Sequence, residues 1–476
     1  MDNKSKISHK SKNKREFPHV FVLLFAVIII FTVLTFIIPA GQYERVVNEA
    51  TGRTVINPAS FKYIDRTPVG PFKMLLSIEE GLIQAAPITF LIFMAFASLF
   101  LIEKTGAMDA SISWMVRKTK RNPKSAKIII AISMMVFAAW ASTGTFSYEE
   151  IIAFIPIFCT LAIALGYDPL VGIGISFVPV GIGFASATIN PFSIGVAQGI
   201  SELPLFSGIG LRIAVLIVMT LITIIYVLRY ADKIKKDPSK SLVADVDFGE
   251  FVIDEKRMAT KFTKERKLSL VVLLIGILTM IYGLTRLHWY INEIAAVFLG
   301  IAIVVGLVNR WKLNKIANTF VEGLSKGVLS ALVVGFARGI LVIIQKGNIL
   351  DSIIHSAADV LNSVNIYISG FGMLLFQSLL NFLIPSGSGQ AATSMPIMAP
   401  LADLIGMKRQ IAVLIFQFGD GFSNLIWPTS FILIACALAK IPLNKYYKWF
   451  LPLFGITFLV QMIFIVIAIN LGYGPF

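Results

Sequence analysis

The amino-acid sequence predicts an all-α polytopic membrane protein, formed by two inverted repeats with two re-entrant hairpins, two broken spans and about nine full spans. Three observations lead to this fold class. Of the 476 residues, 56% are hydrophobic and only 14% are charged, whereas a soluble chain carries about 25% charged residues. Apolar stretches recur along the chain, and each is long enough, at roughly 20 residues, to cross a bilayer. The two halves of the chain also resemble each other at a spacing of about 240 residues.

The first apolar stretch covers residues 20–38 and follows a basic tail. A cleaved signal peptide begins in the same way, but its apolar region is shorter, and here further apolar stretches follow. We therefore expect an uncleaved first span behind a cytoplasmic tail.

The basic segments predict the orientation of the chain. The formal net charge is +15, and the lysines and arginines gather in short connections, which stay in the cytoplasm in membrane proteins. We place five segments there: residues 1–15, 103–127, 229–267, 310–326 and 440–448. Connections with mixed or little positive charge are placed outside: residues 41–72, 201–207, 286–290 and 346–365. No basic face with interleaved aromatic residues appears, so nucleic acid is not an expected partner.

Two regions, residues 126–166 and 366–406, must be re-entrant if these assignments are to alternate along the chain. Each is a long apolar region that small polar residues interrupt in the middle. We expect each to enter and leave the membrane on the same side, as a hairpin.

Internal matches indicate that the two halves are inverted copies. The matches keep their order along the chain: Glu80-Gly81-Leu82 with Glu322-Gly323-Leu324, Pro156-Ile157 with Pro396-Ile397, and Ser186-x-x-Ile189-x-Pro191-x-Ser193 with Ser423-x-x-Ile426-x-Pro428-x-Ser430. The strongly basic segment 103–127 corresponds to residues 346–365, which contain one lysine, Lys346, one histidine and no arginine. Corresponding connections therefore lie on opposite sides. The predicted organisation is a cytoplasmic basic tail (1–16), a first membrane repeat (17–231), a cytoplasmic loop plus a linking span (232–290) and a second, inverted membrane repeat (291–476).

Four interruptions occur in pairs at matching positions of the repeats. They are the hairpin tips 142–147 and 385–390, and the broken spans 186–193 and 419–424, the latter running on to residue 430. A break frees backbone polar groups, which a membrane tolerates only where they line a cavity or are buried in protein. Half-helix N-termini suit a carboxylate, and half-helix C-termini suit a cation. The candidate substrate- or ion-binding residues are Ser142, Thr143, Thr145, Ser147, Glu150, Ser186, Thr188, Asn190, Ser193, Ser386, Ser388, Gln390, Asp420, Ser423, Asn424, Thr429 and Ser430.

Ionisable residues within the apolar zone are few: Glu149, Glu150, Asp420 and Arg338. Charges inside a membrane are costly, so each is a functional candidate. The alternatives are an ordinary interfacial position for Glu149 and a structural pair for Arg338. Acidic groups outnumber basic ones, which favours a site that takes a coupling cation or a cationic group of the solute.

The sequence motifs do not indicate an enzyme. No HExxH zinc motif and no phosphate-binding P-loop occur. Cys159 and Cys436 lie in apolar runs and are expected to be buried packing residues. We therefore expect a protein that is not an enzyme, with no metal centre and no cofactor other than a coupling Na⁺ or H⁺.

Three segments carry a resemblance to a known family: residues 38–43 (Ile-Pro-Ala-Gly-Gln-Tyr), 187–193 (Ala-Thr-Ile-Asn-Pro-Phe-Ser) and 419–424 (Gly-Asp-Gly-Phe-Ser-Asn). Over nearly its whole length the chain resembles YfcC-like transporters of the anaerobic four-carbon dicarboxylate carrier (DcuC-type) family, within the ion-transporter superfamily. The resemblance implies inverted repeats with two re-entrant hairpins, secondary active transport and a bacterial inner membrane. It leaves the substrate open, because the family name refers to dicarboxylates, whereas YfcC-like members are also associated with basic amino acids, including arginine/ornithine exchange.

Taken together, these features predict a multi-pass secondary transporter of a small carboxylate-bearing solute, with its N-terminus in the cytoplasm. The surplus of buried acid favours an amino acid, in particular a basic one moved by an antiporter. The alternative is a Na⁺- or H⁺-coupled four-carbon dicarboxylate carrier, for which Arg338 is the one buried base that offers itself. A channel or a membrane scaffold would be a different class of protein, and breaks in both halves argue against a scaffold. The expected partners are the solute and the lipid bilayer, and the oligomeric state stays open, with a homodimer common among related folds.

Overall fold

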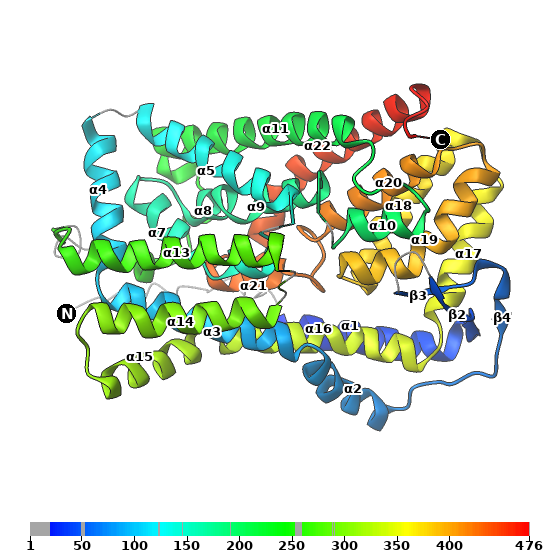
Figure 1. Ribbon diagram of the computed structural model, residues 1–476, viewed down its shortest axis with the longest axis horizontal. Coiled ribbons are helices and arrows are strands. Elements are labelled where there is room, and N and C mark those ends of the chain that lie inside the picture. Colours follow the sequence, from blue (N-terminus) through cyan, green and yellow to red (C-terminus); the bar gives the residue numbers. More distant parts are fainter. Residues whose placement is uncertain are drawn as a thin grey trace, which may run out of the picture.

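Long apolar helices dominate the structure, a computed structural model that describes residues 20–48, 53–121, 124–144, 146–190, 192–252, 259–287, 289 and 291–475 (Figure 1). Among these residues, six helices are long and apolar enough to cross a membrane, and a seventh candidate is a pair of helices that meet at 44°. The prediction of an all-helical, multi-span membrane protein is confirmed. The repeat boundaries, their inversion and the count of about nine spans stay predictions.

The first half of the chain contains α1 to α11. Their bounds are α1 (Val20–Ile37), α2 (Pro71–Gln84), α3 (Ala86–Lys104), α4 (Ala107–Arg121), α5 (Lys124–Ser142), α6 (Tyr148–Ile152), α7 (Ile155–Ala164), α8 (Pro169–Ile175), α9 (Phe177–Ala185), α10 (Ile194–Ile200) and α11 (Ile209–Lys236). Two short 3-10 helices follow, η2 (Pro238–Lys240) and η3 (Gly249–Phe251).

The second half contains α13 to α22. Their bounds are α13 (Lys264–Arg286), α14 (Ile291–Val308), α15 (Leu313–Lys326), α16 (Val328–Lys346), α17 (Leu350–Asn362), α18 (Ile366–Leu383), α19 (Gly387–Leu404), α20 (Arg409–Ser423), α21 (Ile432–Leu438) and α22 (Leu443–Asn470).

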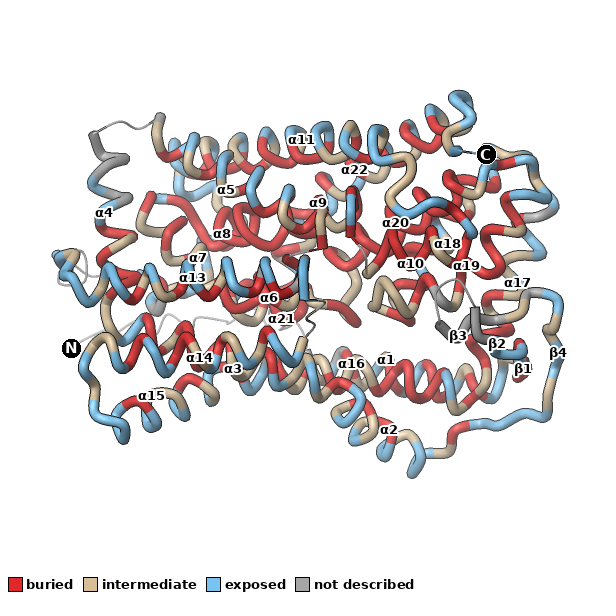
Figure 2. The backbone as a smooth tube through the Cα atoms, viewed as in Figure 1, coloured by how far each residue is buried: buried red, intermediate tan, exposed pale blue. Residues whose placement is uncertain are grey.

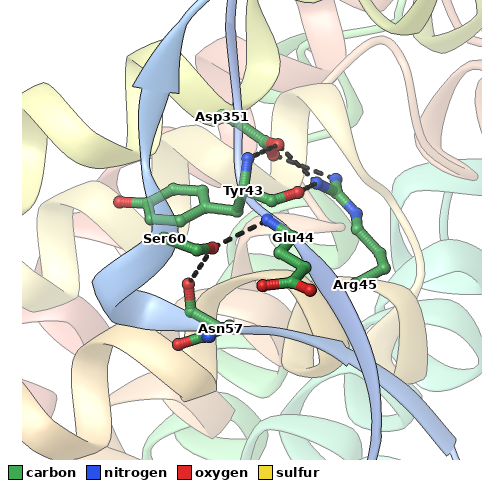
Figure 3. Close-up of polar contacts among 6 residues, drawn as sticks. All are labelled: Tyr43, Glu44, Arg45, Asn57, Ser60 and Asp351. Carbon is green, nitrogen blue, oxygen red and sulfur yellow. Dashed lines mark hydrogen bonds and ion pairs between the residues drawn. The ribbon is translucent and has the colours of Figure 1, made fainter.

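A small β cap between α1 and α2 departs from the all-α prediction. Strands β1 (Gly41–Gln42) and β4 (Lys62–Tyr63) pair antiparallel, as do β2 (Arg45–Asn48) and β3 (Arg53–Ile56), and the 3-10 turn η1 (Pro58–Ser60) lies before β4. Asp351 of α17 holds this cap against the helices. Its carboxylate accepts hydrogen bonds from the Tyr43 N–H at 2.9 Å and from Arg45 Nη1 at 2.5 Å (Figure 3).

The Tyr43 side chain adds a second link between the cap and α17. Burial, together with the Asp351 and Asp359 carboxylates, raises the pKa of Tyr43 to about 12. The phenol therefore stays protonated at neutral pH, and it lies 3.2 Å from Nδ1 of His355.

The helices form two layers (Figure 1). One layer contains α1, α2, α3, α14, α15 and α16, in which α16 packs against α1, α2 and α3. The other contains α5, α8, α9, α11, α20 and α22. Figure 1 places α4 and α15 at one end of the molecule, and α17 and the β cap at the opposite end.

Burial differs sharply within the second layer. Figure 2 shows α8, α9 and α20 almost entirely buried, whereas α11 exposes one side. Exposed residues of α11 include Ile213, Ile217, Leu221 and Ile225, which recur at every fourth position. This spacing is typical of an apolar stripe along a helix, and we assign it to lipid. Helices α9 and α20, which lead into the two broken spans, are thus surrounded by protein, where a membrane tolerates free backbone groups.

All four predicted interruptions separate helices in the structure. They are the gaps between α5 and α6, between α9 and α10, between α18 and α19, and between α20 and α21. Two begin or end differently from the prediction, because residues 387–390 form the first turn of α19 and residues 419–423 the last turns of α20. A Cβ atom on Gly421 would lie 2.4 Å from the Cα of Ala185. Glycine there serves the close packing of α20 on α9, not the unwinding of the helix.

Candidate functional site

The four interruptions meet at one cavity of about 390 Å³. The two hairpin tips contribute Ser147 and Ser386, and the two broken spans contribute Asn190 and Asn424. The facing wall comes from the junction of α2 and α3, from the start of α14 and from α16, so the cavity lies between the two layers. Its size falls within the range of about 300–1,000 Å³ that is usual for small-molecule sites.

Two adjacent carboxylates, Glu149 and Glu150, line this cavity from helix α6. Both contact the hydroxyl of Ser147, which lies 2.8 Å from Glu150 Oε2. The Ser147 N–H also donates to Glu150 Oε2 at 2.7 Å, which completes a capping box at the start of α6. A hydroxyl has a single hydrogen, so it cannot satisfy both carboxylates at once. Two carboxylates this close favour a cation or a proton between them.

The first hairpin tip and the first broken span hold each other in place. The Thr188 N–H donates to the Ser142 carbonyl at 2.7 Å, and the two hydroxyls lie 3.2 Å apart. Asn190 Oδ1 accepts from the N–H groups of Phe192 and Ser193 and so organises the broken backbone. The amide Nδ2 of Asn190 is buried and has no hydrogen-bond partner among the described residues, although Asn190 lines the cavity.

The second broken span is closed by its own side chains. Ser430 donates to Asn424 Oδ1 at 2.6 Å, and Asn424 Nδ2 donates to the Asp420 carbonyl at 2.7 Å. The Tyr148 hydroxyl donates to the Gly421 carbonyl at 2.7 Å, and its ring stacks on Phe431 with centroids 5.4 Å apart. Tyr148 thereby joins the first hairpin to the second broken span.

Asp420 lies behind the second hairpin tip and is completely buried. Its Oδ1 accepts from Asn381 Nδ2 at 3.0 Å, whereas Oδ2 finds no hydrogen-bond partner among the described residues. A Cβ atom on Gly387, which lines the cavity, would lie 3.0 Å from Oδ2. A single residue therefore separates this carboxylate from the cavity. A buried carboxylate with one donor is costly unless it binds a proton or a cation.

Arg338 lines the facing wall of the cavity from α16. Its Nε donates to Gln84 Oε1 at 3.2 Å. In the described part of the chain its partner is thus an amide oxygen and not a carboxylate, which leaves the positive charge for a group in the cavity.

The structure brings part of the predicted set to the cavity wall: Ser147, Glu150, Asn190, Ser386, Ser388, Asn424, Thr429 and Ser430. The remaining described members do not line it: Ser142, Thr143, Ser186, Thr188, Ser193, Gln390, Asp420 and Ser423. Thr145 lies outside the described residues. Which of these side chains bind solute or ion stays a prediction.

Several lining residues escaped the sequence analysis: Gln84, Tyr148, Phe184, Phe192 and Asn292. A signal existed for Gln84, because Pro87 follows it inside an apolar stretch and marks a helix boundary. The aromatic residues carry no such signal in the sequence. In a chain with 12% aromatic residues, the sequence does not distinguish rings that line a cavity from rings that pack in a core.

Comparison with known proteins decides the family. The family model described as C4-dicarboxylate anaerobic carrier (DcuC) matches residues 17–470. This chain belongs to that family. The carrier is 32% identical to the Escherichia coli (strain K12) protein named "Putative basic amino acid antiporter YfcC", over 96% of this chain and 97% of the relative. It is therefore a membrane transporter and not an enzyme, as the sequence predicted.

Two solved transporters also align with nearly the whole carrier. They are MtrF of Neisseria gonorrhoeae, described as illuminating a class of antimetabolite efflux pumps, and YdaH of Alcanivorax borkumensis. MtrF is 17% identical, with a TM-score of 0.45 over 97% of this chain and 98% of its own. YdaH is 16% identical, with a TM-score of 0.45 over 96% of this chain and 100% of its own.

Substitution of Gly144 tests the contact between the first tip and the first break of the carrier. Gly144 has φ +76°, and a Cβ atom would lie 2.6 Å from Asn190 Oδ1. We expect Gly144→Ala to lower the transport rate by about tenfold or more, because the left-handed backbone costs about 1 kcal/mol and Asn190 must also move. Gly166→Ala is the matched control, since Gly166 has φ +82° but open space around it. Equal rates in the two variants would show that the Asn190 contact is unimportant.

Proposed function

We propose that the carrier is a secondary active transporter of basic amino acids, such as arginine and ornithine, that it works by exchange, and that a coupling Na⁺ or H⁺ also drives net uptake. The observation that carries the proposal is the pair Glu149 and Glu150 on the wall of the cavity where the four interruptions meet. Carboxylates in a site shielded from water attract a cationic group strongly. The name of the E. coli relative, a basic amino acid antiporter, supports the same substrate class.

A basic amino acid also matches the other groups of the cavity. Its carboxylate requires donors, and the wall offers Arg338, the free amide of Asn190 and the hydroxyls of Ser386 and Ser388. We assign the side-chain cation of the solute to the acidic pair and its carboxylate to these donors. A solute with charges of both signs is thus accommodated without an unpaired charge in the site.

The frame of this transporter is proposed to be two repeats of opposite orientation, residues 17–231 and 291–476, in a bacterial inner membrane with the N-terminus in the cytoplasm. The placement of the basic elements α4 and α15 at one end, opposite α17 and the β cap, supports the inversion (Figure 1). Interrupted helices at matching positions of inverted repeats are typical of secondary transporters with a site near the bilayer midplane.

Counterflow in proteoliposomes tests the substrate class. Vesicles loaded with unlabelled arginine or ornithine are expected to accumulate labelled arginine transiently, because exchange couples the outward flux to uptake. Vesicles loaded with lysine, citrulline or succinate give the specificity, and citrulline is the decisive comparison because it lacks the side-chain charge. Counterflow as strong with citrulline as with ornithine would contradict the assigned role of the acidic pair.

A second candidate is a Na⁺- or H⁺-coupled four-carbon dicarboxylate carrier, which the family description and the unneutralised Arg338 favour. Gradient-driven uptake of labelled succinate or fumarate would support it. We expect Arg338→Ala to abolish such uptake if the solute is a dicarboxylate, because removal of one charge of a buried pair costs about 2–5 kcal/mol. For a basic amino acid we expect Arg338→Ala to raise KM by about tenfold and to leave citrulline discrimination intact, since the acidic pair is unchanged.

A further inference from the structure

The carbonyl groups freed at the first break are held by a buried arginine. Arg212 lies in the first turn of α11, and its side chain is completely buried. Its Nε donates to the Ala187 carbonyl at 2.7 Å and its Nη2 to the Thr188 carbonyl at 3.0 Å. The same guanidinium donates to the carbonyls of Phe206 and Ser207. One side chain thus spans the first break and the loop that leads into α11.

The second break is held differently at the corresponding place. There the hydroxyls of Tyr446 and Tyr447, near the start of α22, donate to the carbonyls of Leu425 at 3.0 Å and Ile426 at 2.6 Å. In each half, therefore, the long helix that follows the break donates hydrogen bonds back to the carbonyls of the break. The donor is charged in the first half and neutral in the second.

The charge difference matters because freed carbonyls at the C-terminal end of a half-helix form a place for a cation. At the first break the guanidinium occupies that place. Among the described residues no carboxylate forms an ion pair with Arg212, and its partners are four backbone carbonyls and the Tyr473 hydroxyl, whose dipoles face the charge. At the second break phenols satisfy the carbonyls without adding charge, and the buried Asp420 lies within the same helix end.

Arg212 connects to the cavity through Thr188. The backbone and the hydroxyl of Thr188 both donate to the Ser142 carbonyl, at 2.7 and 3.1 Å, in the first hairpin tip. Asn190, two residues further along, lines the cavity. The position of Arg212 therefore determines where two sides of the cavity meet, although its own side chain does not line it.

We propose that Arg212 is a positioning residue that acts as a built-in cation. It fixes the first break in its cavity-lining conformation without a bound ion, so that a mobile coupling cation has its place at the second break only. The inference about the coupling cation rests on the proposed transport function, whereas the fixed first break does not.

Amide hydrogen exchange on the purified full-length protein tests the proposal without a substrate. We expect Arg212→Gln to accelerate exchange of the peptide covering residues 186–208 by about tenfold or more, because several charge-assisted hydrogen bonds are lost. Arg212→Lys keeps the charge and is expected to restore most of the protection. Arg45→Gln is the matched control, because Arg45 pairs with Asp351 at the β cap, outside residues 186–208. Tyr446→Phe/Tyr447→Phe should loosen residues 423–431 and leave 186–208 unchanged.

The wild-type protein provides a test that needs no variant to fold. Replacement of NaCl by choline chloride at equal ionic strength should leave exchange at 186–208 unchanged, because the guanidinium already fills the cation place. Slower exchange of residues 186–208 in Na⁺ than in choline would overturn the proposal. So would an Arg212→Gln protein whose residues 186–208 exchange at the wild-type rate, or an Arg212→Lys protein in which they exchange as fast as in Arg212→Gln. Absence of arginine counterflow in the wild type would contradict the transport proposal alone. The hydrogen-exchange results would still test whether Arg212 fixes the first break.

Discussion

Replacement of both Glu149 and Glu150 by glutamine is expected to reduce arginine counterflow about 100-fold at low substrate, because loss of a buried charge contact costs roughly 2–5 kcal/mol. The fold should survive, since glutamine also completes a capping box and can accept from the Ser147 N–H that Glu150 now binds. The effect should appear mainly in KM, because the carboxylates hold the solute before and during its passage. Initial rates over a range of arginine concentrations, with the thermal stability of each purified variant, provide the measurement.

The single variants separate the two carboxylates. Glu150 accepts from the Ser147 N–H and also contacts the Ser147 hydroxyl, whereas Glu149 contacts that hydroxyl alone. We therefore expect Glu149→Gln to weaken arginine binding more than Glu150→Gln does, and Glu150→Gln to lower thermal stability more. Glu202→Gln, in an exposed ion pair with Arg409, is the matched control and should leave KM unchanged. A double variant with wild-type KM would remove the basis of the basic-amino-acid assignment.

The sequence could predict the four interruptions because each one carries a local signal. Gly, Pro, Ser, Thr and Asn break an apolar helix and satisfy freed backbone groups, so their clusters stand out within long apolar runs. Asn190 shows the rule, since its side chain caps the N–H groups that the break exposes. The approximate positions followed from these residues and from their pairing in the repeat.

The limits of the fourth interruption could not be predicted, because a glycine can mark either an unwound segment or a close contact between helices. The sequence alone does not distinguish these two roles. Gly419 and Gly421 flank Asp420 and resemble an unwound segment, yet all three lie in α20. A Cβ atom on Gly419 would lie 2.4 Å from the Cβ of Gln377, so this glycine permits a close helix contact. Only the packing partner, which is distant along the chain, separates the two roles.

Arg212 escaped the sequence analysis for a related reason. It lies near the start of an apolar span, where an arginine is expected to extend to the membrane surface. In the structure it points inward and is fully buried, with the Ala187 and Thr188 carbonyls as partners. These carbonyls are backbone groups, so no residue type earlier in the sequence indicates that Arg212 has partners there. A base that binds backbone oxygens leaves no complementary charge in the sequence.

Asp420→Asn is expected to abolish accumulation of arginine that depends on an ion gradient, without harm to the fold. Oδ2 of Asp420 is buried without a hydrogen-bond partner among the described residues, and Oδ1 accepts one bond, from Asn381. A carboxylate in this setting must take up a proton or a cation whenever its site closes. Asparagine keeps the shape and the acceptor but carries no charge, so nothing remains to be neutralised.

Uptake driven by imposed Na⁺ and pH gradients, compared with counterflow at zero gradient, measures this effect. We expect the gradient-driven component to disappear and counterflow to persist, because exchange of solute for solute needs no net movement of the coupling ion. Thermal stability should equal or exceed that of the wild type, since an unpaired buried charge opposes folding. Asp403→Asn, which alters an exposed carboxylate paired with the half-buried Arg409, is the matched control. Wild-type gradient-driven uptake in Asp420→Asn would place the coupling ion elsewhere, whereas loss of counterflow as well would assign Asp420 to the solute itself.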